Sequence, residues 1–318
     1  MSTATIVTSA ITTMYAASAT RPYGSSAVAM NGESPPAITD EGWDPSEDDE
    51  DHEARISAAT ALGKLRNAAA CQALMAELEK RTSSDSTLAS YIVGALGEMG
   101  NAEGIPLIES AIASGDFELQ KIGSWALARL GTEGMEALLR LAANHDHTAR
   151  PYVIRALGTN TVESATPLLL QILKDPNEDK LVRCQAAQAL GKIGGSPETL
   201  PLLLAMLQAP EELVGTGALL GLGALHDSRA YSAIVERLGS GLHRYTAIMA
   251  LGELGDPRAC ELLIPMLKTG DDSRTYHAAT ALAKLGCCDA LPALIHCAIR
   301  CRVRILLFQG LTEPLSKR

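Results

Sequence analysis

A short motif of small and apolar residues recurs along the chain at a nearly constant interval. The triplet Ala-Leu-Gly, or a close variant of it, repeats with spacings of 34, 31, 30, 33, 32, 29 and 31 residues and starts at Ala61, Ala95, Ala126, Ala156, Ala189, Gly221, Ala250 and Ala281. Self-similarity at a period of this length is the sequence signature of a repeat protein. The pattern predicts about eight structural repeats.

Each repeat combines an Ala-rich segment, a turn and a Leu-rich segment, as in Cys184–Gly191, Gly255–Arg258 and Glu261–Leu267. Glycine permits the left-handed backbone that ends a helix, and Asp followed by Pro favours the start of the next helix. One helical hairpin cannot bury its apolar face alone, so the repeats must stack. We expect an all-α, right-handed α-solenoid of two-helix repeats over residues 53–310, with a short tail at 311–318.

Polar residues also recur at fixed distances from the repeat glycine. An arginine stands eight residues before it in several repeats, and a capping-type residue stands four residues after it in several: Arg55, Arg150, Arg183, Arg244 and Arg302, and Asn67, Asn101, Thr132, Asp227 and Asp256. A ladder of side-chain hydrogen bonds between adjacent repeats would explain both sets. We therefore give them a structural role.

Two segments carry a resemblance to a known family. The phrase Val182–Gly194 and the phrase Ala250–Ala259 resemble the HEAT-like repeat of the phycobilisome (PBS) lyase family, and the resemblance covers roughly residues 53–310. It implies the fold more specifically than the function. In this family, bilin lyase subunits of the E/F type work as heterodimers that attach or remove phycobilin chromophores, and other members are adaptors or assembly factors.

The resemblance also implies a binding surface. In HEAT stacks the second, Leu-rich helices are expected to line the concave side. When these helices are aligned, the residue at one position, here called the slot, varies from repeat to repeat while its flanking residues stay Leu or Ile. Together with its neighbours this slot predicts partner-binding residues at Glu109, Ser110, Arg140, Gln171, Met206, Glu236, Arg237, Met266, Lys268 and His296. A solvated helix face would give the same variation, so that alternative stays open.

Charge separates the N-terminus from the rest of the chain. The net charge is −10, and residues 1–53 hold ten acidic groups and one basic group, nine of the acidic groups lying between Asp40 and Glu53. Such a block repels itself, so residues 1–52 are expected to form a disordered leader that is Ala/Ser/Thr-rich and then acidic. We expect a cytoplasmic protein, or one of the plastid stroma if residues 1–30 are a transit peptide.

The cysteines suggest structure more than chemistry. Seven are present, none in Cys-x-x-Cys spacing, and most lie in apolar helical stretches, which is typical of free buried thiols in a reducing compartment. A metal site at His296, Cys297 and Cys301, or at His145 and His147, is the less favoured alternative. We predict no metal.

Several function classes find no support in the sequence. It contains no phosphate-binding loop, no dinucleotide fingerprint and no nucleophile elbow. Nucleic acid and a membrane span are not expected, because there is no basic stripe and no long apolar run. The sequence favours a protein-binding scaffold or assembly adaptor without a cofactor. The alternative is a phycobilin lyase subunit with phycobilin as substrate, its protein partner being a phycobiliprotein or a second HEAT-repeat subunit.

Overall fold

The computed structural model describes residues 48–81, 86–194, 196–241, 243–268 and 272–297, and every regular element within these ranges is an α-helix or a 3-10 turn. The chain forms two compact units, one ending at Ala156 and the other beginning at Leu157. The all-α repeat architecture expected from the sequence is confirmed.

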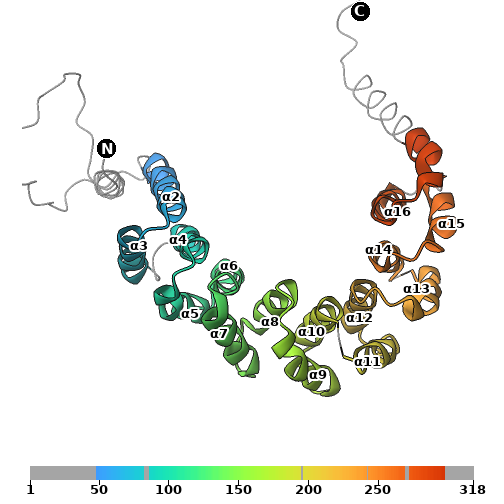
Figure 1. Cartoon of the computed structure of the whole chain (residues 1–318), viewed down its shortest axis with the longest axis horizontal. Coiled ribbons are helices and arrows are strands. Elements are labelled where there is room, and N and C mark those ends of the chain that lie inside the picture. The colour runs from blue at the N-terminus through green and yellow to red at the C-terminus, as the bar shows by residue number, and fades with distance from the viewer. Residues whose placement is uncertain (1–47, 82–85, 195, 242, 269–271, 298–318) are drawn as a thin grey trace, which may run out of the picture. The chain divides into compact units, whose positions relative to one another are not determined.

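Unit 1 is a series of helix pairs joined by short turns (Figure 1). Its elements are α2 (Asp48–Leu65), α3 (Ala68–Arg81), α4 (Ser86–Met99), η1 (Ala102–Gly104), α5 (Ile105–Ala113), α6 (Phe117–Leu127), α7 (Gly131–Ala143) and the first part of α8 (Arg150–Thr159). The Ala-Leu-Gly triplets lie on α2, α4, α6 and α8, and the Leu-rich segments form α5 and α7.

Unit 2 continues the same alternation. Its elements are the end of α8, η2 (Glu163–Ala165), α9 (Thr166–Lys174), α10 (Lys180–Ile193), α11 (Thr199–Met206), α12 (Glu212–Ala224), η3 (Ser228–Ala230), α13 (Tyr231–Glu236), η4 (Arg237–Gly239), α14 (Arg244–Leu254), α15 (Ala259–Leu263), η5 (Ile264–Lys268), α16 (Asp272–Leu285) and η6 (Cys288–Ala290). The triplets lie on α10, α12, α14 and α16.

Glycine and alanine bring the Ala-Leu-Gly helices of each unit into close contact. A Cβ atom built on Gly97 of α4 would lie 2.6 Å from the Cα of Ala126 on α6, and one on Gly252 of α14 would lie 2.7 Å from the Cα of Ala281 on α16. Backbones can approach this closely only where side chains are absent or small. The repeat glycine is therefore required by packing between repeats.

The Leu-rich helices form a second and more widely spaced layer in each unit, because Leu and Ile side chains keep their backbones apart (Figure 1). Within a unit the more closely packed layer is the inner one. The expectation that the Leu-rich helices line the concave side is therefore corrected: in each unit the Ala-Leu-Gly helices take this place.

The expected polar ladder is present in part. Arg150 donates from Nε to the carbonyl of Ala142 at 3.0 Å, and Arg244 donates from Nε to the carbonyl of Leu238 at 3.2 Å. Each arginine thus satisfies a carbonyl near the end of the preceding Leu-rich helix and links it to the next repeat. Arg302 lies outside the described residues.

The capping residues bond mostly within their own repeat. Asn101 accepts the amide of Glu103 and Asp227 accepts the amide of Arg229, both at 3.0 Å. These are N-caps of short 3-10 turns and do not reach the arginines of a neighbouring repeat. The amide side chain of Asn101 does contact Cys71 Sγ of the preceding repeat, at 3.4 Å.

The helical array begins before the expected boundary. Helix α2 starts at Asp48, so residues 48–53 of the acidic block are helical and not unfolded. The N-terminus of a helix carries partial positive charge, which favours an acidic first turn. The expectations for residues 1–47, for the last repeat at 302–310 and for the tail at 311–318 concern segments outside the described residues. No helix among the described residues is long and apolar enough to cross a bilayer.

The cysteines depart from the expected set of free thiols. Cys260 of α15 and Cys287, just after α16, form a disulfide with their Cα atoms 6.1 Å apart. Cys71 and Cys184 are free and buried, Cys288 is free and exposed, and Cys297 is buried. Stacking of consecutive repeats brings the disulfide pair together, and their spacing of 27 residues in the sequence does not reveal it.

Candidate functional site

Exposed large apolar side chains gather on the Ala-Leu-Gly helices. Seven of the ten in the described residues lie there: Tyr91, Phe117, Trp125, Leu181, Leu213, Met249 and Tyr276. In a protein with few aromatic residues, water-exposed rings on one layer are informative, because such patches mark interaction surfaces. This layer is the candidate functional surface of each unit.

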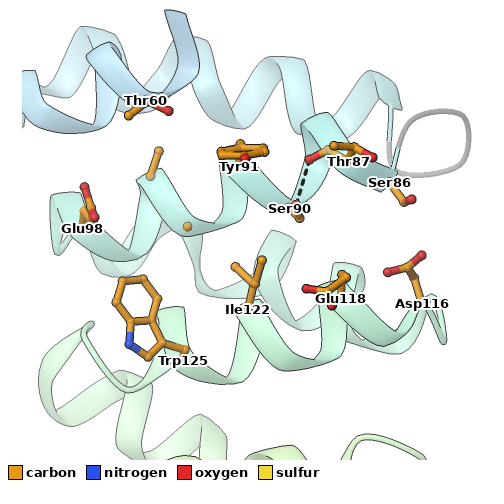
Figure 2. Close-up of a pocket in the computed structure, with 12 residues that line it drawn as sticks. Thr60, Ser86, Thr87, Ser90, Tyr91, Glu98, Asp116, Glu118, Ile122 and Trp125 are labelled. Carbon is orange, nitrogen blue, oxygen red and sulfur yellow. Dashed lines mark hydrogen bonds between the residues drawn. The ribbon is translucent and has the colours of Figure 1, made fainter. Parts of the chain in front are cut away.

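In unit 1 this surface holds a groove of about 590 Å³ between α2, α4 and α6 (Figure 2). Its volume is in the range of sites that bind small molecules or side chains of a partner. The groove is lined by Thr60, Ser86, Thr87, Ser90, Tyr91, Gly94, Ala95, Glu98, Asp116, Glu118, Ile122 and Trp125. Figure 2 shows it running from Glu98 and Trp125 at one end to Ser86 and Asp116 at the other.

Two exposed rings form the walls of the unit 1 groove. Tyr91 and Trp125 are 46% and 42% exposed, although most residues of their helices that face the core are fully buried. Tyr91, Gly94 and Glu98 are spaced three and four residues apart, so they share one face of α4. Trp125 and Ile122 come from the facing side of α6.

The polar side chains of this groove differ in how far they are engaged. Asp116 caps α6 by accepting the amide of Leu119 at 3.0 Å, and Glu118 pairs with Lys121 at 3.2 Å. Glu98 is half-buried and forms no hydrogen bond or ion pair with another described residue. It is therefore the carboxylate of the lining that remains available to a ligand.

The ring of Trp125 already contacts a cation. The guanidinium carbon of Arg129 lies 4.7 Å from the ring centroid. Both residues lie on or next to the end of α6, where spacing by four residues places them on one face. The contact is a cation–π interaction that occupies one face of the Trp125 ring.

Unit 2 carries a smaller groove, of about 160 Å³, on the same layer between α10, α12, α14 and α16. Its apolar floor includes Leu220 and Met249, and Met249 is 45% exposed. Lys192 and Lys284 stand at its rim, the latter paired with Glu253 of α14. Lys192 forms no ion pair with another described side chain. This groove is apolar and cationic, unlike the groove of unit 1.

An aromatic cluster supports one side of the unit 2 groove. His277 of α16 is half-buried, and its ring centroid lies 5.4 Å from that of Tyr245 and 5.3 Å from that of Tyr276. Packed rings have few accessible rotamers, so His277 is held at the groove wall.

The residues predicted from the Leu-rich helices do not line either groove. Glu109 and Arg140 form an ion pair at 2.9 Å between α5 and α7. Met206 is only 4% exposed and belongs to the core, so its assignment to a binding surface is wrong. The others are exposed or half-buried on the Leu-rich side: Ser110, Gln171, Glu236, Arg237, Met266, Lys268 and His296.

A signal for the grooves was present in the sequence and was missed. The residue immediately before each triplet varies freely along the repeats: Thr60, Gly94, Trp125, Arg155, Gln188, Leu220, Met249 and Thr280. Seven of these line one of the two grooves, Arg155 being the exception. We call this the pre-triplet position. It varies because it faces outward while the triplet itself contacts the next helix.

The residues weighed as metal ligands have other surroundings. His147 accepts the amide of Ala149 on Nδ1 at 3.1 Å and so supports the turn before α8. Cys297 is buried and His296 is exposed, while Cys301 lies outside the described residues. Within the ranges that the structure covers, no three His, Cys, Asp or Glu side chains are grouped to hold a metal ion.

The buried thiols are poor nucleophiles. Burial raises the pKa of Cys71 and that of Cys184, with hydrogen bonds from Asn101 and Gln188 opposing the effect only in part. A thiol with a raised pKa stays protonated near neutral pH.

The stacked helix pairs, with glycine at the inner contact and variable residues beside it, define a helical repeat protein. The HEAT-repeat model matches residues 135–223, 166–241 and 232–307, more than half of the chain, and the model of the PBS lyase HEAT-like repeat matches residues 54–80. The chain belongs to the HEAT-repeat family, and its resemblance to the PBS lyase type of repeat is confirmed.

Two curated relatives are proteins of bilin metabolism. The chain is 29% identical over 192 residues to the bilin biosynthesis protein PecE of Mastigocladus laminosus, covering 58% of this chain and 71% of PecE. It is 29% identical over 220 residues to the phycocyanobilin lyase subunit alpha of a Nostoc species, covering 63% of this chain and 78% of that subunit. A solved complex of CpcE and CpcF of phycocyanin lyase from Nostoc aligns at 23% identity with a TM-score of 0.41, covering 82% of this chain and all of that chain.

Proposed function

We propose that the chain is a subunit of a bilin lyase, which acts with a second protein subunit to attach a phycobilin to a phycobiliprotein cysteine or to remove it. The observation that carries this proposal is the likeness to PecE and to the phycocyanobilin lyase alpha subunit, which extends over more than two thirds of each relative. A single shared repeat would support only the fold.

The groove of unit 2 is the candidate chromophore contact. A linear tetrapyrrole has an apolar conjugated body and negatively charged propionate groups. The floor at Leu220 and Met249 suits the former, and Lys192 at the rim, which has no ion pair with another described side chain, suits the latter. A volume of about 160 Å³ accommodates one end of such a molecule, so the rest would be covered by the second subunit or by the acceptor protein.

The chain would contribute positioning to the reaction. Attachment adds a thiol S–H across a carbon–carbon double bond of the bilin, so the acceptor cysteine supplies both sulfur and proton and nothing is oxidised. Cys71 and Cys184 are unsuited to hold the bilin as a thioether intermediate before its transfer to the acceptor, because burial keeps both thiols protonated. Holding the bilin and the acceptor in one orientation is itself a large source of rate enhancement.

A protein-binding adaptor without lyase activity is the second candidate. The exposed rings of unit 1 favour it, because water-exposed Tyr and Trp on a helical layer are typical of protein interfaces. An adaptor would bind its protein partner with or without bilin.

Titration of the purified chain with phycocyanobilin tests the proposal. We expect a shifted visible absorption band on binding, and transfer to an apo-phycobiliprotein when a second lyase subunit is added. Lys192→Gln should weaken bilin binding by ~3- to 10-fold, since it removes a cation from the groove. Lys268→Gln, an exposed lysine on the Leu-rich side, is the matched control. No spectral change with bilin, together with binding of the apo-protein, would favour the adaptor.

A further inference from the structure

Gly94 differs from the repeat glycines of unit 1. A Cβ on Gly63 or Gly97 would lie under 3 Å from an alanine of the next helix, whereas a Cβ on Gly94 would meet only Ile122 Cγ2, at 3.7 Å. Glycine in a helix interior is unfavourable, and packing does not require it at this position. Its effect is to leave open space on the floor of the unit 1 groove, between Tyr91 and Trp125.

The side chains around this opening select for positive charge. Glu98 shares the face of α4 with Gly94, is half-buried and has no partner among the described residues. Asp116 and Glu118 stand at the far end of the groove (Figure 2). The Arg129 guanidinium already lies over one face of the Trp125 ring, and the exposed remainder of the ring offers apolar surface to a ligand. Because Glu98 has no partner among the described residues, its carboxylate would repel an anionic ligand and pair with a cationic one.

We infer that the unit 1 groove is a docking site for a protein segment that presents arginine or lysine beside an apolar residue. The long aliphatic stem of such a side chain fits over Gly94 between the two rings, and its charged head reaches Glu98. The neighbouring apolar residue covers Ile122. This surface differs in charge from the groove of unit 2, and the inference does not depend on bilin chemistry.

Trp125 can report directly on occupancy. The chain contains two tryptophans, Trp43 and Trp125, so the full-length Trp43→Phe variant has Trp125 as its single indole. The probes are a short synthetic peptide that alternates arginine with leucine, its counterpart with citrulline in place of arginine, and its counterpart with glutamate. Citrulline keeps the shape of arginine and removes its charge.

We expect a saturable change in Trp125 emission with the arginine peptide, weakened at least ~10-fold by citrulline and by added salt. Glu98→Gln should weaken the arginine peptide ~5-fold or more, and Glu136→Gln, a matched exposed glutamate on α7, should leave it unchanged. Gly94→Leu should fill the floor and abolish the signal, while Gly94→Ala, which fits without a clash, should retain the fold and weaken binding.

Three outcomes would overturn the inference. Equal affinity for the arginine and citrulline peptides would show that charge does not select the occupant. Unchanged peptide affinity in Gly94→Leu, measured by anisotropy of a labelled peptide, would place the peptide elsewhere, with the acidic residues 40–53 as the obvious competitor. A stronger response of Trp125 to phycocyanobilin or to the glutamate peptide would make the groove an anion site. The first two outcomes leave the proposed role of Lys192 and of the unit 2 groove unaffected, and only the response to phycocyanobilin would also question where the bilin binds.

Discussion

At the scale of single residues, the same amino acid has opposite roles in neighbouring turns of α4. Gly97 is where the backbone of α6 touches, and a methyl group there would lie 2.6 Å from the Cα of Ala126. Gly94 faces the groove and leaves its space empty. Helix propensity disfavours both glycines equally, so only their surroundings distinguish a packing role from a binding role.

The two glycines therefore make a matched pair for stability measurements. Gly97→Ala should destabilise unit 1 by about 1–3 kcal/mol, because α4 and α6 must separate to admit the methyl group. Gly94→Ala should stabilise it by about 0.5–1 kcal/mol through helix propensity. Urea denaturation followed by circular dichroism measures both, and a loss of stability in Gly94→Ala would show that its space is needed for packing.

The free cysteines should differ sharply in reactivity. Cys288 is exposed, whereas burial raises the pKa of Cys71 and of Cys184 and shields both sulfurs. Brief alkylation of the native protein should label Cys288 and spare the other two, which should react only in denaturant. Mass spectrometry of tryptic peptides locates the label. Rapid labelling of Cys184 in the native protein would contradict its placement in the core.

At the scale of elements, short turns connect the two layers and carry much of the local polar structure. Asp256 accepts the amide of Arg258 at 3.0 Å and also receives its guanidinium, which in turn lies over the ring of Tyr231 at 4.1 Å. Asp227 and Arg229 repeat the carboxylate–guanidinium arrangement one repeat earlier. The preceding Gly255 has a φ of 77°, which ends α14 and sets the direction of the turn.

Asp256 should make the stability of unit 2 depend on pH. The Arg258 guanidinium holds the pKa of that carboxyl below its ordinary value. The stabilisation is therefore complete above the unfolded-state pKa of about 3.9 and is lost as pH falls through the lower folded-state pKa. Asp256→Asn keeps an oxygen to cap the turn but loses the charge. Its denaturation midpoint should fall at neutral pH and match that of the unmodified protein in strong acid. An equal deficit at both pH values would assign the loss to the cap.

The repeat period and its turn residues were enough to predict the helix pairs, because glycine, Asp-Pro and the triplet act locally. Which of the two helix layers lies on the inner side of a unit could not be predicted in this way. Leu-rich and Ala-rich helices both bury apolar side chains, and which layer curves inward depends on how closely the backbones approach. Met206 is an example, because the sequence predicts it as a neighbour of the variable surface slot and the structure buries it. The Cys260–Cys287 pair depends on stacking in three dimensions, which spacing does not reveal.

At the scale of the whole molecule, a near-neutral repeat region conceals opposite local charges. Residues 1–53 hold nearly all of the net negative charge, yet the grooves of the two units differ, one lined by carboxylates and the other edged by lysines. Judged by net charge alone, a near-neutral repeat region would be expected to select its partner by shape. The described surfaces predict that each unit also selects by charge.

Reduction of the disulfide should act on one part of the molecule only. Repeat proteins are stabilised by contacts between neighbours, and Cys260–Cys287 joins two consecutive repeats of unit 2 across 27 residues of chain. Dithiothreitol should lower the stability of these repeats by about 2–4 kcal/mol. Hydrogen exchange should rise in α15 and α16 and stay unchanged in α4 and α6. Cys260→Ser should reproduce the effect without reductant, and Cys288→Ser should not.

The separation between the triplet and the pre-triplet position has a consequence for how such a chain diversifies. The triplet glycine and alanine make the contact with the next helix, so the residue before them can be exchanged without repacking. Duplicating, deleting or exchanging one repeat would then add, remove or replace one residue in the row of pre-triplet positions. Its effect on the binding surface would resemble that of a single substitution. Recombination between related chains would therefore generate new binding specificities at little risk to folding, because the pre-triplet residues, such as Thr60, Gly94 and Trp125, line a groove.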